Sequence, residues 1–205
     1  IAALQSVAEN QDIDSQSGDL DVIGAAQLSG INCVQIMMVR DGRILGSRAH
    51  YPKVQLDETL PELLSAFIAQ HYINNSTYRC PPQLLVSETL SDAQALAEVL
   101  TEVNNRKVAV LSQLRGRRAR WLSMAKNTAL QNCQSRLADR NNSQQRNASL
   151  AAILKLEAAP ERLECFDISH SHGELTVASC VVFDANGPLK SDYRRFNIDG
   201  DYWWR

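Results

Sequence analysis

The stretch Leu163-Glu-Cys-Phe-Asp-Ile-Ser-His170 decides how the rest of the chain is interpreted. Apolar residues dominate it, which is typical of a β-strand, yet Asp167 places a carboxylate near its middle. A carboxylate in an apolar strand is expensive to bury unless a metal ion or a hydrogen-bond donor meets it. Asp167 is therefore the strongest candidate for a functional residue in this sequence.

Two more strands are predicted after this stretch. Residues Thr176 to Phe183 are apolar and β-branched, the turn residues Asp184-Ala-Asn-Gly187 follow, and Pro188 to Ile198 alternates polar and apolar residues. The three runs predict an antiparallel meander. A meander whose first strand carries an aspartate at its middle opens the RNase H-like nuclease fold, in which that aspartate bridges two divalent metal ions.

Several short sequence motifs in this region and upstream of it are distinctive. They are Glu164-Cys-Phe-Asp-Ile-Ser-His170, Val177-Ala-Ser-Cys-Val-Val-Phe-Asp184, Asn186-Gly-Pro188, Tyr193-Arg-Arg-Phe-Asn197, Asp21-Val-Ile-Gly24, Leu45-Gly-Ser-Arg48, Tyr51-Pro-Lys-Val54 and Arg115-Gly-Arg117. Together these motifs resemble the sequences of the UvrC family, the C subunits of the bacterial excinuclease ABC. The resemblance covers nearly the whole chain.

The resemblance implies part of an endonuclease that cuts damaged double-stranded DNA in nucleotide excision repair, with the UvrB subunit as a partner. It implies that carboxylates hold two Mg²⁺ or Mn²⁺ ions, bridged by Asp167. The pair Asp201-Tyr202 resembles an Asp-Tyr pair of the family whose aspartate is a second catalytic ligand, although the loop before Asp201 is shorter than in the family. His170 is expected on the opposite face of the strand from Asp167, in a structural role.

Composition is that of a globular protein outside the membrane. The chain has 205 residues, 44% of them hydrophobic and 21% charged, with a net charge of −2. No apolar run approaches the roughly 20 residues of a spanning helix, and the first residues do not resemble a signal peptide, so a cytoplasmic protein is expected. The five cysteines stand singly, which favours core thiols over a zinc or iron–sulfur site.

The region from Leu20 to Val54 repeats the meander pattern, which suggests an internal repeat. Placing Leu20 on Leu163 also places Asp41 on Asp184 and requires one inserted residue in the later turn. Gly24 then occupies the position of Asp167, so the first copy lacks the bridging carboxylate. The alternative is that any two hydrophobic meanders align this well.

Helices and strands after the first meander predict a mixed α/β sheet. Thr59 and Glu62 form a capping-box pair at the start of one helix, and Ser91 with Gln94 is predicted to cap a second. Short strands are predicted at 83–86 and 107–111. In an RNase H-like order the first of these strands should end in a second metal-binding carboxylate.

Ser87 stands at the end of that strand, and Glu88 is the nearest acid. The first RNase H-like domain is therefore predicted to be inactive and to have a structural or binding role.

The segment between Glu102 and Asp139 contains no acidic residue, so its positive charges are locally uncompensated. The predicted nucleic-acid-binding residues are Arg115, Arg117, Arg118, Arg120 and Lys126. The arginines gather at the start of a predicted helix, where the helix dipole disfavours cations. A bound anion would compensate their positive charge. A phosphate backbone suits both arginine and helix N-terminal N–H groups. The alternative is a solvated basic face.

The polar run from Asp139 to Ser149 is predicted to interrupt the helix, with a short helix from Leu150 to Leu156 after it. Four segments are thus expected: the end of a UvrB-contacting helical hairpin and linker (1–18), an RNase H-like domain (19–138), a connecting helix (139–161), and the truncated start of a catalytic RNase H-like domain (162–205).

Two classes of function stay open at this point. One is a metal-dependent endonuclease. The other is a non-catalytic scaffold that binds DNA and other subunits, which is favoured for this piece of chain by itself. A transposase or resolvase with the same fold is disfavoured by the specific sequence motifs that resemble the UvrC family.

Overall fold

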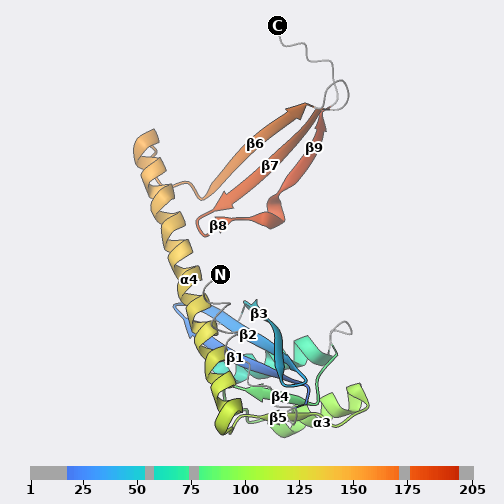
Figure 1. Ribbon diagram of the computed structural model, residues 1–205. Coiled ribbons are helices and arrows are strands. Elements are labelled where there is room, and N and C mark those ends of the chain that lie inside the picture. Colours follow the sequence, from blue (N-terminus) through green and yellow to red (C-terminus); the bar gives the residue numbers. More distant parts are fainter. Residues whose placement is uncertain (1–17, 54–57, 74–78, 171–175, 199–205) are drawn as a thin grey trace. The chain divides into compact units, whose positions relative to one another are not determined.

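The computed structural model describes residues 18–53, 58–73, 79–170 and 176–198 (Figure 1). The predicted helix remnant at 1–7, His172 and Asp201 lie outside these residues. The chain divides into two compact units, residues 1–135 and 136–205, and each is described by itself.

The first unit contains a five-stranded mixed sheet. Its strands are β1 (Leu20–Leu28), β2 (Ile31–Arg40), β3 (Arg43–His50), β4 (Gln83–Val86) and β5 (Ala109–Leu111). The order is β3-β2-β1-β4-β5, with β1, β2 and β3 antiparallel and β4 and β5 parallel to β1. The predicted meander followed by a mixed sheet is confirmed.

Helix α2 (Leu60–Ile68) starts at the predicted capping box. The Glu62 carboxylate accepts hydrogen bonds from the backbone N–H and hydroxyl of Thr59, at 2.9 and 2.7 Å, and these bonds hold the pKa of Glu62 below its usual value. A π-helical turn, η1 (Ala69–Ile73), continues the helix.

Helix α3 (Ala93–Asn104) differs from its prediction, because Asp92 and not Ser91 occupies the N-cap position. The Asp92 carboxylate accepts a hydrogen bond from the hydroxyl of Ser65, and the amide of Gln94 donates to Glu98 at 3.1 Å. Only Leu96 and Leu100 of α3 are buried.

Helix α4 (Gly116–Leu154) is a single helix of 39 residues, so the predicted interruption at 139–149 was wrong. That stretch contains no glycine or proline, and its asparagine, serine and glutamine residues disfavour a helix by only about 0.7 kcal/mol or less each. Two contacts of its polar residues in the second unit offset that cost. Asn147 is 8% exposed and donates to the carbonyl of Pro160 at 3.4 Å, and Ser143 lies beside Gly187.

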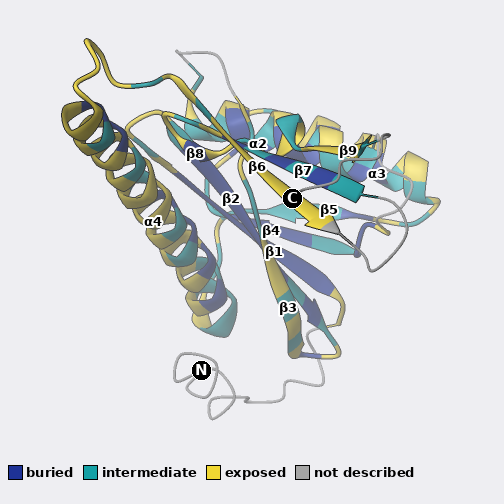
Figure 2. Cartoon of the chain, turned by 90° about the horizontal axis from the view of Figure 1, so that it is seen from above, coloured by how far each residue is buried: buried dark blue, intermediate teal, exposed yellow. Residues whose placement is uncertain are grey.

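The sheet of the first unit lies between two layers of helix. On one side, Ile23, Ala25, Val34 and Ile36 pack against α2 and α3. On the other side, α4 covers the strands with the apolar stripe Trp121, Ala125, Ala129 and Cys133. Figure 2 shows β1 and β2 mostly dark blue, whereas the outer side of α4 is yellow.

Helix α4 approaches the sheet most closely at Gly24 of β1. A Cβ atom at Gly24 would lie 2.4 Å from the backbone carbon of Ala125 and 2.4 Å from the backbone nitrogen of Lys126. These are main-chain atoms of a regular helix, which cannot move aside as a flexible side chain could. Only glycine is compatible with this contact.

Asp21 of β1 forms an ion pair with Arg40 of β2 and a hydrogen bond with Tyr72 in the turn after α2. The Arg40 guanidinium donates to Asp21 Oδ1 at 2.7 Å, and the Tyr72 hydroxyl donates to Asp21 Oδ2 at 2.8 Å. Arg40 also donates to the carbonyls of Leu20 and Val39. Burial, together with the nearby Asp21 charge, raises the pKa of Tyr72 above its usual value. Asp21 is 4% exposed, so its charge depends on these donors.

The second unit contains the other meander. Its elements are β6 (Arg162–His170), β7 (Thr176–Asp184), β8 (Gly187–Pro188), the 3-10 turn η2 (Lys190–Asp192) and β9 (Arg194–Ile198). Strand β7 pairs antiparallel with β6 on one side and with β8 and β9 on the other. The predicted third strand is therefore divided by a turn.

The two meanders share their strand order, but the alignment needs a correction. Leu20 lies opposite Val39 in the first meander, whereas Leu163 lies opposite Phe183 in the second. The second hairpin is therefore one residue longer already between its first two strands, and placing Asp41 on Asp184 was wrong. Gly24 and Asp167 both lie within their first strands.

The first prediction concerns the helix contact at Gly24. Replacing Gly24 with alanine should lower the free energy of unfolding by about 3 kcal/mol, because the added methyl group overlaps helix backbone. The matched control is Gly46→Ala in β3, where the new Cβ would meet only the methyl of Met38 at 3.5 Å. Urea denaturation of both variants measures the difference, and equal stabilities would contradict the close contact.

Two histidines lie in an aromatic cluster between β3 and the turn after α2. The rings of His50 and His71 are 5.1 Å apart, and Phe67 lies 5.2 Å from His50 and 5.3 Å from His71. Burial lowers the pKa of both histidines below the ordinary 6.5, with Arg48 adding to the effect on His50 and the other histidine adding to that on His71.

The second prediction follows from these two pKa values. Below about pH 6.5 the unfolded chain takes up protons that the folded cluster resists, so the free energy of unfolding should fall as the pH is lowered from 7.5 to 5.5. The double variant His50→Gln, His71→Gln should lose part of this pH dependence. Thermal denaturation at a series of pH values measures it, and an unchanged slope in the double variant would contradict the assignment.

Candidate functional site

Asp167 lies within β6, opposite Ser179 of β7. Its side chain is exposed, as are those of Cys165, Phe166 and Ile168 around it. Asp167 is therefore not a buried charge, and its strand β6 lies at the edge of this sheet. Among the described residues, no hydrogen bond or ion pair engages its carboxylate.

The strand register separates the second sheet into two faces, because paired residues lie on the same face and successive residues alternate. The face with Asp167 also carries Cys165, Ser169, Val177, Ser179, Val181, Arg195 and Asn197. The opposite face carries Phe166, Ile168, Ala178, Cys180, Val182 and Phe196, together with the charged residues Arg162, Glu164 and Arg194. Its β7 residues Ala178, Cys180 and Val182 are buried, so Asp167 stands on the more exposed face of this sheet.

A complete metal site is not visible in the part of the chain that the structure describes. No three histidine, cysteine, aspartate or glutamate side chains come together among those residues. Asp167 is an exposed hard oxygen ligand without a competing partner, which suits a divalent cation. His170 is the last residue of β6.

The corresponding place in the first unit is closed. Helix α4 rests on Gly24, and the hydroxyl of Ser87 accepts a hydrogen bond from the backbone N–H of Ala25 at 3.0 Å. Glu88, the nearest acid, is held by Lys126 of α4 at 2.8 Å. Each position where a ligand could stand is therefore used for packing.

The arginines lie where α4 begins, as the sequence predicted. The helix starts at Gly116, whose φ of +63° is a left-handed conformation, and its first turn contains no acidic residue. Arg115 and Arg120 are exposed, whereas Arg117 and Arg118 are partly buried. Lys126 differs from them because Glu88 already compensates its charge.

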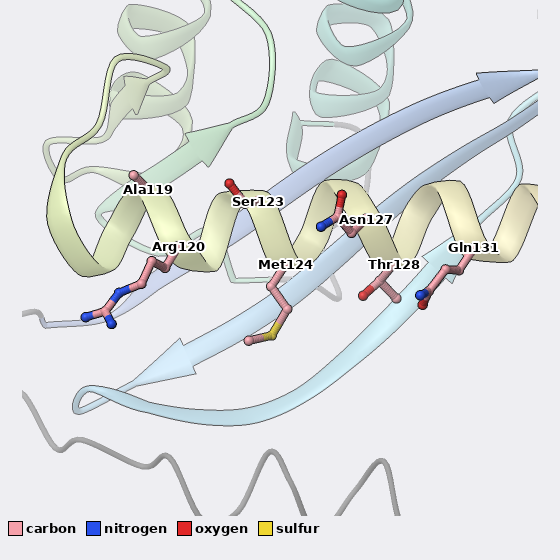
Figure 3. Close-up of a pocket in the computed structure, with 7 residues that line it drawn as sticks. All are labelled: Ala119, Arg120, Ser123, Met124, Asn127, Thr128 and Gln131. Carbon is pink, nitrogen blue, oxygen red and sulfur yellow. The ribbon is translucent and has the colours of Figure 1, made fainter.

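A shallow hollow of about 540 Å³ continues from the arginines along α4 (Figure 3). Its described lining consists of Ala119, Arg120, Ser123, Met124, Asn127, Thr128 and Gln131. Amide and hydroxyl groups dominate this lining, and Arg120 is its charged member. Hydrogen-bonding side chains beside a cation are the kind of surface that contacts a phosphate backbone.

Sequence reasoning missed both the hollow and the Lys126–Glu88 pair. The pair joins residues 38 positions apart, and no local pattern announces it. The hollow did have a signal, which is the helical spacing of the uncharged polar residues Ser123, Asn127, Thr128 and Gln131 after Arg120.

The described residues contain no helix that is long and apolar enough to cross a membrane. Of the five cysteines, four are buried free thiols and only Cys165 is exposed. The prediction of core thiols is confirmed for the four.

Comparison with known proteins agrees with the geometry. Residues 19–136 match the family described as UvrC Ribonuclease H-like domain, and residues 151–202 match the family described as UvrC RNAse H endonuclease domain. The UvrABC system protein C of Shewanella piezotolerans is 45% identical over 98% of this chain, and that of Saccharophagus degradans is 43% identical over 98%. Each match covers 33% of the relative, so the chain spans about a third of the length of these relatives. The chain belongs to the UvrC family, and it carries the family's RNase H-like fold.

Proposed function

We propose that this chain is the central part of a subunit that incises damaged DNA during nucleotide excision repair, with Asp167 as a catalytic carboxylate. The carrying observation is that Asp167 lies exposed on the more exposed face of the second sheet, within the segment that matches an endonuclease domain. The surface around it is open, so a DNA strand can reach the carboxylate.

The reaction is the hydrolysis of a phosphodiester bond, for which Mg²⁺ or Mn²⁺ is the proposed cofactor. Bound in pairs, such ions activate a water molecule and stabilise the leaving oxygen. Asp167 would hold both ions, and Asp201, outside the described residues, is the proposed second ligand. The role of the chain is to present hard oxygen donors at an exposed and otherwise uncharged stretch of strand.

The first unit has a different role in this proposal, because its equivalent site is filled. It serves as a scaffold that holds DNA and the UvrB subunit while the second unit cuts. The start of α4 supports DNA binding, since exposed arginines stand at a helix N-terminus and beside a hollow lined with amides and hydroxyls. A cytoplasmic location follows from a substrate that is chromosomal DNA.

The alternative is that this piece of chain, taken alone, is only a non-catalytic scaffold. The observation that favours it is the absence, among the described residues, of a second metal ligand beside Asp167. Cleavage assays on the full-length protein and on this piece distinguish the two.

The third prediction tests the catalytic carboxylate. In the full-length protein, Asp167→Asn should abolish the incision that depends on this domain and leave DNA binding unchanged, because a neutral amide cannot hold two dications. Glu164→Gln removes a carboxylate from the other face of the same strand, and it should cut normally. Gel analysis of a labelled, damaged duplex measures both, and cutting by the Asp167 variant would place the metal site elsewhere.

The fourth prediction tests the basic start of α4. Replacing Arg115 and Arg118 with alanine should weaken DNA binding about equally for all sequences and reduce the slope of log K against log salt by about two units. The control replaces Arg43 and Lys53, two exposed cations of the same unit, with alanine. Fluorescence anisotropy at several salt concentrations measures the slopes, and equal slopes for the two double variants would exclude the helix start as the DNA contact.

A further inference from the structure

Strand β9 begins with two adjacent arginines that lie on opposite faces of the second sheet. Arg194 pairs with Cys180, which lies on the face opposite Asp167. Arg195 pairs with Ser179, which in turn pairs with Asp167 across β7. The register therefore places Asp167, Ser179 and Arg195 in one row across three strands.

The two arginines also differ in their contacts. The Arg194 guanidinium donates to the carbonyls of Ser191 and Tyr193, at 2.8 and 2.9 Å, so the structure of the preceding turn uses it. No hydrogen bond or ion pair joins Arg195 to another described residue, and its side chain is exposed. Arg195 is therefore available for a ligand, and Arg194 is not.

Charge on the Asp167 face is sparse. Among the described residues of β6, β7 and β9, Asp167 and Arg195 are the only charged residues on this face. Their α-carbons are two strand spacings apart, about 10 Å, with the small side chain of Ser179 between them. A cation at this distance is too far away to neutralise the carboxylate directly, but it lies within the span of a nucleic-acid strand that crosses the sheet.

We propose that Arg195 binds a phosphate of the DNA strand that is cut at Asp167, and so positions that strand across β7. This inference rests on the proposed function, and it names a substrate contact of the same site. The physical reason is that carboxylates repel the phosphates they must act on, so the face needs a cation that holds the strand without binding the carboxylate. A guanidinium presents a planar fork of donors that matches two phosphate oxygens.

Two other accounts of Arg195 lead to different measurements. If Arg195 only balances the charge of Asp167, its removal should lower the melting temperature of the wild-type protein but not that of an Asp167→Asn variant. If Arg195 is only a solvated surface residue, its removal should resemble the removal of Arg194 in DNA binding and cutting.

The experiment compares Arg195→Ala, Arg195→Lys, Arg194→Ala and Asp167→Asn in the full-length protein. Single-turnover incision of a duplex with one fluorescein-modified thymine is measured with the partner subunits and Mg²⁺. Binding of the same duplex is measured in EDTA over a range of salt concentrations, so that this readout does not depend on metal. Melting temperatures are measured for Arg195→Ala alone and combined with Asp167→Asn.

Arg195→Ala should lower the incision rate by about 10- to 100-fold, the loss expected for one charge-assisted hydrogen-bonded contact. It should also reduce the salt slope in EDTA by about one unit. Arg195→Lys should recover part of the rate, because lysine keeps the charge without the fork. Arg194→Ala should change neither rate nor slope.

The inference is wrong if Arg195→Ala and Arg194→Ala give the same rate and slope while Asp167→Asn abolishes cutting; the proposed function then stands. It is also wrong if Arg195→Ala lowers the melting temperature only when Asp167 is present and leaves the salt slope unchanged. Continued cutting by Asp167→Asn would overturn the proposed function itself, and this inference with it.

Discussion

The contact between Gly24 and the backbone of α4 is the constraint on which the first unit depends. A strand that must accept a helix at 2.4 Å from the position of a Cβ cannot carry any side chain there. The helix contact therefore excludes every side chain at this position, a carboxylate included. The same contact accompanies extensive burial, because Ala125, Ala129 and Cys133 are all fully or nearly fully covered.

The second unit shows the other solution of the same meander. Its strand β6 is exposed at Asp167, and no helix backbone of the described residues lies on that position. The two units therefore differ at this place in the meander. In the first unit a helix covers the strand, and in the second a carboxylate stays exposed.

Local patterns were enough to predict much of this structure from the sequence. The capping box at Thr59 and Glu62, the alternation in the strands and the apolar stripe of α4 each depend on neighbours within a few residues. The continuity of α4 through 139–149 could not be predicted in this way, because the contacts of Ser143 and Asn147 are made with Gly187 and Pro160, which lie outside the helix. Gly24 was a partial exception. A glycine inside a strand is a known sign of close backbone approach, but its partner helix lies 100 residues later.

The same distinction between local patterns and contacts between segments applies to the candidate site. Asp167 and the arginines stood out because of residue type and local composition. The pairing of Lys126 with Glu88 and the row that ends at Arg195 depend on register between strands and helices, which a single sequence does not reveal.

One cysteine of this chain makes the face with Asp167 reactive towards reagents that modify thiols. Burial raises the pKa of the Cys80 thiol to about 11 and also raises that of Cys133, so these thiols are poor nucleophiles. Cys165 is the one exposed cysteine, and it lies on the same face as Asp167, about 7 Å along the strand. An alkylating or oxidising agent that spares the core would modify Cys165 first. Its adduct would stand beside the Asp167 carboxylate, so a reagent for exposed thiols is expected to reach this face before it reaches the core.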